Sequence, residues 1–458
     1  MLRPLTVALL LAGASAHAAA NTDLMTVYQQ AVLNSADLAA AQADALARQE
    51  ALPQARSQLL PNLGVAAGAS RQDLDIDNVG GDEYSNHYYQ ASLTQPLFRA
   101  DRWFSYQAAK SVSQQAQLEF SATQQNLILE VSQAYFNVLR ASDNLATAKA
   151  EEKAFSRQLE QARERFEVGL SARTDVLEAQ AGYDSARAAR LTAQTNLDVS
   201  YQALTRLTTQ DYDSLYGISH ELPILPPTPA SMQQWVETAA EQNLTLQASR
   251  YAIDSAEDSL RSSKAGYAPV VDAFVRYSNG GASIAGTGQA STDTELTSFG
   301  VELSMPLFTG GLTTSRVRES TYRLTQAEQS SEAQLRRVVE STRNLYRTVT
   351  SSVDEVAARR QAIVSAKAAL DATQTGYEVG TRNVVDVLEA QRNLFRTVRD
   401  YNTVRYNYII NNLSLKQAAG TLSPQDLQDL SQWLNPNYDP DRDFIPQTTE
   451  EEARQMSM

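Results

Sequence analysis

The motif Asp175-Val-Leu-Glu-Ala-Gln180 occurs twice in this chain of 458 residues. It returns 211 positions later as Asp386-Val-Leu-Glu-Ala-Gln391. A Glu-Val-Gly turn precedes each copy, at residues 167–169 and 378–380. A chain that repeats itself at about half its length is typical of a protein made of two similar structural units. We therefore predict a fold built from two internal repeats.

The ends of the chain and its middle differ in composition from these repeats. Arg3 precedes an apolar run and a cluster of small residues, which is the order of features in a secretory signal peptide, here cleaved after Ala18 or Ala20. Prolines mark a linker in the middle, and beyond Trp433 the chain becomes proline-rich and acidic, which favours disorder. We expect a signal peptide (1–20), a first repeat (21–216), a linker (217–231), a second repeat (232–432) and a disordered acidic tail (433–458).

Each repeat is expected to form a helix, two strands, a long helix, a turn and a further helix. Alternation of apolar and polar residues predicts the strands. Phe299, Val301 and Leu303, for example, alternate with polar residues or glycine. The predicted strands cover residues 63–75, 88–98, 271–277 and 297–305.

Two long segments without glycine or proline predict long helices. Residues 100–167 and 312–375 contain neither glycine nor proline, and helices of this length would run about 100 Å at 1.5 Å per residue. In the first of them apolar residues recur at heptad spacing, which is typical of coiled coils. These core positions are Leu127, Val131, Ala134, Val138, Ala141, Leu145, Ala148, Phe155, Leu159, Ala162 and Phe166.

Composition excludes several classes of site. The chain has no cysteine and three histidines, so disulfides, a lipid-anchored N-terminus and cysteine-based metal sites are excluded, and we expect neither a metal nor a cofactor. The net charge of −14 argues against nucleic acid. After the signal peptide, no run of about 18 apolar residues predicts a transmembrane helix. An enzyme is not expected, because the acidic pairs have no nucleophile or oxyanion donor beside them.

The strands limit where the protein can reside. Four strands with an apolar face cannot close a membrane barrel, because the smallest such barrels have about eight strands. An open sheet in lipid would leave backbone groups unpaired. Either the sheet packs on something soluble, or several chains share one barrel. An exported protein with a shared barrel and helices of about 100 Å would suit an outer membrane above a periplasm.

Motifs in both halves resemble the TolC family of outer-membrane channel-tunnels. The match runs from about residue 24 to residue 430, in the same order and spacing. It implies an α+β membrane protein, a homotrimer whose twelve-stranded β-barrel (four strands per chain) continues into a long α-helical coiled-coil barrel. The motifs are Gln133-Ala-Tyr-Phe-Asn-Val-Leu139, Arg165-Phe-Glu-Val-Gly-Leu170, Tyr377-Glu-Val-Gly-Thr-Arg382, Arg405-Tyr-Asn-Tyr-Ile-Ile-Asn411 and Ala419-Gly-Thr-Leu-Ser-Pro-Gln-Asp426.

The resemblance also implies a function and partners. The protein would be the outer-membrane exit duct of a tripartite export machine, passing proteins (type I secretion), small molecules such as drugs, or both, through an iris-like periplasmic gate. Its partners would be outer-membrane lipid, a periplasmic adaptor (membrane fusion) protein and an inner-membrane ABC, RND or MFS transporter. An alternative is a periplasmic coiled-coil adaptor, which would share the long hairpins and the export signal but not the alternating strands.

The repeated motif supplies the candidate site residues. Asp386 and Glu389 lie three residues apart on one helix face, and the resemblance implies that they ring the periplasmic entrance of the pore. The best-known members have aspartate at the position of Glu389, and a solvated acidic face is the plain alternative for the pair. The implied gate links are Thr174, Asp175, Tyr377 and Arg382. The implied adaptor-docking tips are Val168, Gly169, Leu170, Val379, Gly380 and Thr381, whose glycines also permit the positive φ of a helix end.

Overall fold

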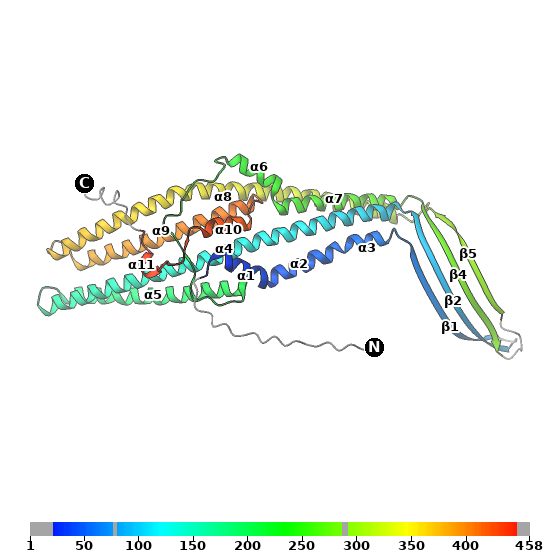
Figure 1. The fold of residues 1–458 in the computed structure, drawn as a ribbon, viewed down its shortest axis with the longest axis horizontal. Coiled ribbons are helices and arrows are strands. Elements are labelled where there is room, and N and C mark those ends of the chain that lie inside the picture. Colours follow the sequence, from blue (N-terminus) through cyan, green and yellow to red (C-terminus); the bar gives the residue numbers. More distant parts are fainter. Residues whose placement is uncertain (1–21, 77–79, 286–291, 447–458) are drawn as a thin grey trace. The chain divides into compact units, whose positions relative to one another are not determined.

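The computed structural model describes residues 22–76, 80–285 and 292–446. The expected signal peptide and residues 447–458 of the expected tail lie outside the described residues. In each half, short helices precede two strands, a long helix, a turn and a further helix, as predicted (Figure 1).

The helices are α1 (Leu24–Asn34), α2 (Ala36–Gln49), α3 (Ala51–Ser57), α4 (Ala100–Glu167), α5 (Arg173–Thr208), α6 (Met232–Gln242), α7 (Leu244–Ala265), α8 (Leu312–Glu378), α9 (Val384–Ala418), α10 (Pro424–Ser431) and α11 (Pro440–Asp443). The strands are β1 (Asn62–Ile76), β2 (Gly80–Phe98), β3 (Gly217–Ile218), β4 (Val270–Ala285), β5 (Thr292–Ser304) and β6 (Leu434–Asn435).

The chain divides into two compact units, and the long helices α4 and α8 contribute to both. Within the described residues, no helix combines the length and the apolarity of a membrane span. Unit 1 comprises residues 22–38, 125–236 and 342–446; unit 2 comprises residues 39–76, 80–124, 237–285 and 292–341.

Unit 2 contains an antiparallel sheet of four strands in the order β1-β2-β4-β5 (Figure 1). Its register places Leu63 opposite Leu93, Leu93 opposite Val275, and Val275 opposite Phe299. These four side chains form one apolar row across the sheet. They are exposed in the chain, with Leu63 71% and Phe299 81% accessible. The register therefore gathers the apolar residues of all four strands on one face.

The residues adjacent to these four in sequence lie on the opposite face of the sheet. Gly64, Ser92, Arg276 and Ser298 form the adjacent row, which is polar apart from its glycine. Successive side chains of a strand point to opposite faces of the sheet. The alternation read from the sequence is therefore confirmed as one apolar and one polar face.

An ion pair fixes the point at which the sheet leads into the first long helix. Arg99 precedes α4, and its Nε and Nη2 atoms donate to the two carboxylate oxygens of Asp272 on β4, at 3.1 and 2.5 Å. A bidentate pair of this kind restricts orientation as well as distance. It holds the end of β2 against β4 just where the chain turns into the helix.

The core of unit 1 follows the heptad pattern of α4. All the predicted core positions from Leu127 to Ala162 are buried, whereas Phe166 near the helix end is 44% exposed. Alanine at alternate core positions leaves room for neighbouring helices to approach closely. The coiled-coil character of the first long helix is thus confirmed along its part in unit 1.

Residues 432–446, which we call the C-terminal strap, differ from expectation. Strand β6 of the strap pairs with β3, which lies within the expected linker. Tyr438 donates its hydroxyl to Asp143 on α4 at 2.6 Å, and the Asn402 amide of α9 donates to the carbonyl of Phe444 at 3.1 Å. The expectation of disorder from residue 433 onward is therefore wrong for residues 433–446. These tertiary contacts hold a segment whose own composition favours disorder.

Two titratable groups anchor the strap. Asp143 is fully buried and accepts hydrogen bonds from Tyr438 and from Tyr406 (2.8 Å). Burial raises its pKa to about 6, although the two tyrosines and the nearby Arg405 act against the rise. An unsatisfied carboxylate would be very costly at this depth, so the two hydroxyl donors are what make the site tolerable.

His220 is half-buried beside the strap. Arg405 donates to its Nδ1 atom at 2.8 Å, so the ring proton resides on Nε2, which donates to the carbonyl of Asp443 at 2.8 Å. Burial lowers the pKa of His220 to about 4, and the charge of Arg405 adds to this decrease. The imidazole therefore links α9 to the strap in its neutral form.

These pKa shifts predict opposite effects of pH. The folded-state pKa of Asp143 lies above its ordinary value, so its contribution to the free energy of unfolding grows as the pH falls from about 6 to 3.8. The folded-state pKa of His220 lies below its ordinary value, so its contribution is lost as the pH falls from 6.5 to about 4. We expect the two effects to offset each other in the wild-type protein.

Substitutions should separate the two effects. In Asp143→Asn, His220 is the one group of this pair that still titrates. The free energy of unfolding of this variant should therefore fall by on the order of 3 kcal/mol between pH 6.5 and 4. His220→Gln should give the opposite slope, with stability rising as the pH falls. Urea unfolding of the full chain in a neutral detergent, followed by far-ultraviolet circular dichroism, measures both slopes. Parallel pH profiles for the wild type and the two variants would contradict the assignment.

Candidate functional site at the hairpin tips

Each long helix ends in a glycine turn that reverses the chain. Gly169 between α4 and α5 has φ +77°, and Gly380 between α8 and α9 has φ +81°. The next residue closes each turn, because the Leu170 amide donates to the carbonyl of Arg165 at 2.7 Å and the Thr381 amide to that of Gly376 at 2.8 Å. A side chain at either glycine would be strained at this φ. The glycines of the repeated motif are thus needed to make the hairpins.

The tips expose apolar side chains. Val168, Leu170 and Val379 are each 70% accessible. Single exposed apolar residues are ordinary on protein surfaces, but a pair on one short turn leaves little polar surface around them. The first hairpin therefore ends in a small apolar surface that a partner could cover, and the second exposes one apolar side chain, that of Val379.

Asp175 occupies the first turn of α5. It accepts hydrogen bonds from the Ser171 hydroxyl at 2.8 Å and from the Ala172 amide at 3.3 Å. A carboxylate at this position satisfies amides that the helix leaves free and favours the positive end of the helix dipole. Thr174 beside it is exposed. Asp175 therefore has a structural role at the helix start, whatever else it binds.

Asp386 has the equivalent position in α9. Its carboxylate accepts from the Asn383 amide at 3.1 Å, and the Asn383 side chain accepts from the Asp386 amide at 2.9 Å. This reciprocal arrangement is a capping box. Arg382 lies 4.0 Å from the same carboxylate, and Glu389, one turn further on, is exposed. The two carboxylates of the motif thus differ, since one caps the helix and the other faces solvent.

Tyr377 lies inside the tip and is only 7% exposed. The Arg165 guanidinium lies 4.8 Å from the centre of its ring. Its hydroxyl is buried, and among the described residues it has no hydrogen-bond partner. Burial raises the pKa of Tyr377; the charge of Arg165 opposes this rise, and that of Asp175 adds to it. The tyrosine therefore feels the charge of Asp175 on the other hairpin and retains an unused donor.

A single chain brings only some of the predicted gate residues together. The charge of Asp175 reaches Tyr377, but within the part of the chain described Arg382 makes no hydrogen bond to Asp175 or Thr174, and its ion pair is with Asp386. Sequence reasoning missed Arg165, whose contact joins positions 212 residues apart and leaves no local signal. It also missed the cap, although Asn383 followed three residues later by Asp386 is a readable capping pattern.

The described residues hold no group of three or more histidine or acidic side chains placed to bind a metal ion.

Comparison with known proteins gives a consistent result. The outer membrane efflux protein family matches residues 27–210 and 235–421. The chain is 38% identical to outer membrane protein TolC of Vibrio cholerae serotype O1, over 90% of this chain and 94% of the relative. It is 34% identical to outer membrane protein TolC of Escherichia coli K12, over 99% and 93% of the two chains. A more distant relative is the alkaline protease secretion protein AprF of Pseudomonas aeruginosa, 27% identical over 81% and 79%.

Solved structures agree on the fold. The outer membrane protein VceC from Vibrio cholerae superposes with a TM-score of 0.75, covering 87% of this chain and 96% of that chain, at 20% sequence identity. The family match, with its two segments, covers most of both halves of the chain. This chain belongs to the outer membrane efflux protein family and is an outer-membrane channel protein that extends into the periplasm.

Proposed function

We propose that three copies of this outer-membrane protein form one exit duct. Each copy would contribute its four strands to a twelve-stranded barrel, and the long helices would continue the duct through the periplasm as a coiled-coil barrel. The same order of elements in both halves supports two internal repeats, within residues 21–216 and 232–432. We also propose that residues 1–20 are removed as a signal peptide during export.

The apolar row across the sheet carries this proposal. Leu63, Leu93, Val275 and Phe299 are accessible on one face of a four-stranded sheet whose edge strands are β1 and β5. An apolar face suits lipid, but free backbone groups at a sheet edge are prohibitively costly there. Four strands are too few to close upon themselves, since the smallest membrane barrels need about eight. Joining β5 of one copy to β1 of the next satisfies both requirements.

The relatives suggest what the duct would carry. One of them is named for the secretion of an alkaline protease, and the family is named for efflux. We infer that the duct serves protein export of the type I kind, efflux of small molecules such as drugs, or both. The match to the outer membrane efflux protein family also argues against the alternative of a periplasmic adaptor.

A duct of this kind needs partners that supply cargo and energy. We propose a periplasmic adaptor and an inner-membrane ABC, RND or MFS transporter. The exposed apolar tips support docking of the adaptor, because their side chains have no cover within the described chain. The docking residues would be Val168, Gly169, Leu170, Val379, Gly380 and Thr381.

The gate would be held by links between hairpins. The buried hydroxyl of Tyr377 has an unused donor, the charge of Asp175 influences its pKa, and the Arg382 side chain is exposed. In the closed assembly, we propose that Tyr377 and Arg382 donate to Thr174 and Asp175, whether within one chain or from the next. Each link contributes about 1–3 kcal/mol, so a few of them could hold the entrance shut and yield to a docked partner.

Asp386 and Glu389 would form the narrow acidic entrance. Three copies would place six carboxylates around one axis, where they attract cations. Glu389 is exposed and free to face the axis, whereas the Asp386 carboxylate also caps α9. A substitution that tests the charge of Asp386 must therefore preserve the cap.

The barrel proposal predicts a difference between adjacent residues of β5. Phe299→Arg would place a charge on the lipid-facing row, at a cost of about 2–4 kcal/mol near the middle of a bilayer. Ser298→Arg would place the same charge on the polar face. We expect the first variant to lose most of its heat-dissociable oligomer from outer-membrane fractions on unheated gels, and the second to retain it. Equal loss in both variants would contradict the assignment of the faces.

The gate proposal predicts a change in conductance. Tyr377→Phe combined with Arg382→Ser removes the donors, and the variant should show higher single-channel conductance in planar bilayers. Arg396→Ser serves as the control, because Arg396 is an exposed arginine of α9 whose one hydrogen bond within the described residues goes to Asn393 on its own helix. Wild-type conductance in the double variant would count against these links.

The acidic entrance predicts weaker block by cations. Asp386→Asn keeps a side-chain oxygen for the cap, and Glu389→Gln keeps the shape of the side chain, so together they remove charge alone. The concentration of a divalent or trivalent cation that gives half block should rise about tenfold, the effect of losing about 1.4 kcal/mol of binding. Glu178→Gln, from the first copy of the motif, should leave block unchanged. Unaltered block in the double variant would place the constriction elsewhere.

A further inference from the structure

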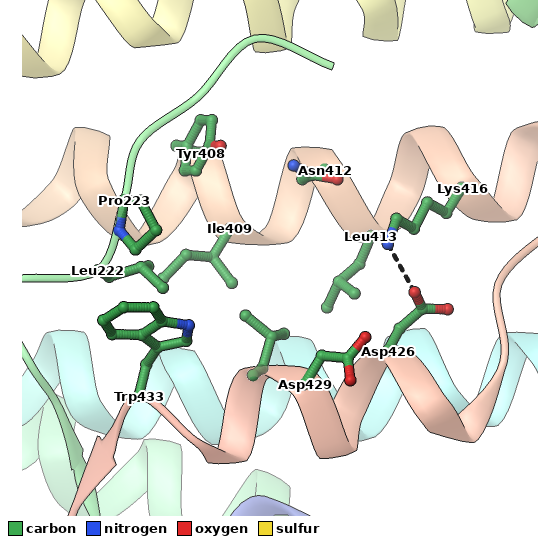
Figure 2. A pocket seen from close by; sticks show the side chains of 11 residues that line it. Leu222, Pro223, Tyr408, Ile409, Asn412, Leu413, Lys416, Asp426, Asp429 and Trp433 are labelled. Atoms are coloured by element: carbon green, nitrogen blue, oxygen red, sulfur yellow. Dashed lines mark hydrogen bonds and ion pairs between the residues drawn. The ribbon is translucent and has the colours of Figure 1, made fainter. Parts of the chain in front are cut away.

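A pocket of about 190 Å³ lies in unit 1 between α9, α10 and the segment that follows β3. One end is apolar, and the other carries the charged side chains of Lys416, Asp426 and Asp429 (Figure 2). This pocket belongs neither to the hairpin tips nor to the sheet, and the exit-duct proposal does not use it. The apolar residues that line the pocket are Leu222, Pro223, Ile409, Leu413, Leu430 and Trp433.

The walls of the pocket are fixed by hydrogen bonds. The Tyr408 hydroxyl donates to the carbonyl of Leu225 at 2.8 Å and accepts from its amide at 3.0 Å, which holds the loop against α9. The Ser219 amide donates to the carbonyl of Trp433 at 3.0 Å, and the Trp433 amide donates to that of Leu430 at 3.0 Å. A pocket with such walls exists before a ligand arrives, so binding does not have to order it.

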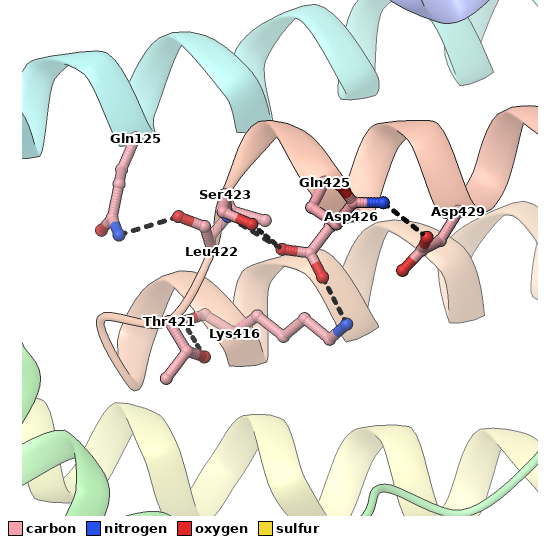
Figure 3. Close-up of polar contacts among 8 residues, drawn as sticks. All are labelled: Gln125, Lys416, Thr421, Leu422, Ser423, Gln425, Asp426 and Asp429. Atoms are coloured by element: carbon pink, nitrogen blue, oxygen red, sulfur yellow. Dashed lines mark hydrogen bonds and ion pairs between the residues drawn. The ribbon is translucent and has the colours of Figure 1, made fainter.

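The two carboxylates at the polar end are not equivalent. Asp426 accepts from Lys416 Nζ at 2.6 Å and from the Ser423 amide at 2.8 Å, so an ammonium ion and a helix start compensate its charge. Asp429 accepts from the side-chain amide of Gln425 at 3.1 Å, its one hydrogen bond among the described residues (Figure 3). Asp429 is exposed, so water solvates its carboxylate, and among the described residues no cation is paired with it.

We propose that this pocket binds a small organic cation with an apolar or aromatic body, such as a quaternary ammonium compound. The body would lie against the indole of Trp433 and the neighbouring aliphatic side chains, and the cationic group would face Asp429. The volume suits such a body, since a cavity of about 150 Å³ already holds benzene. Aromatic faces also attract quaternary ammonium groups directly.

The charges of the pocket argue against other small ligands. An anion would meet two carboxylates, one of them uncompensated. A neutral apolar molecule would fill the same space but would gain nothing from the negative charge of Asp429, whereas a cation gains a Coulombic attraction to it. A cation with an apolar body satisfies both ends at once.

Binding of benzyltrimethylammonium to the full chain in a neutral detergent tests the proposal. We expect saturable binding in a ligand-observed NMR titration. Asp429→Asn should weaken it about tenfold, which corresponds to about 1.4 kcal/mol, and Trp433→Leu should weaken it as well. Asp198→Asn is the matched control and should bind as the wild type does. Asp198 is an exposed carboxylate of α5 that accepts from a glutamine four residues earlier, as Asp429 does, but it does not line the pocket.

A neutral probe decides whether charge matters. Benzyl alcohol carries the same ring without the cation, so it should bind more weakly than benzyltrimethylammonium and depend less on Asp429, to which it can offer only a hydroxyl hydrogen bond. The proposal is overturned if the cation shows no saturable binding to the wild-type protein. It is also overturned if Asp429→Asn, with unchanged circular dichroism, binds the cation as tightly as the wild type.

Discussion

The unpaired backbone at the two edges of the four-stranded sheet is the constraint on which the rest of this protein depends. Each of β1 and β5 has one neighbour in the chain, and the register collects apolar side chains on one face of the sheet. Contact of the apolar face with lipid is favourable, but unpaired backbone N–H and C=O groups at the sheet edges are very costly there. On this account, association of copies is a requirement of the membrane environment, because no rearrangement of four strands can remove their own edges.

The sheet fixes where the first long helix begins, and the repeated motif fixes where both long helices end. The Arg99 pair with Asp272 fixes where α4 begins, and a glycine with positive φ ends both α4 and α8. The first carboxylate of each motif copy then starts the returning helix by binding free amides. The residues proposed to gate the duct thus also build the hairpins, so substitutions there must separate charge from capping.

Much of this could be predicted from the sequence, because the relevant signals are periodic or local. Alternation located the strands, and heptads located the buried face of α4, since both patterns depend on near neighbours. The ordered strap could not be predicted, because the composition of a segment carries no information about its tertiary contacts with distant residues. Its order depends on Asp143, which lies 295 positions from Tyr438. The stacking of Arg165 on Tyr377 was missed for the same reason, whereas the Asn383 cap was readable and overlooked.

The number of chains in the assembled protein tests the account most directly. Native mass spectrometry of the protein extracted from outer membranes in a neutral detergent counts the copies without reference to any relative. We expect three copies, which supply the twelve strands of one closed barrel. A single chain would contradict this expectation, because the sheet edges would be left open in lipid. Two or four copies would contradict the twelve-stranded barrel.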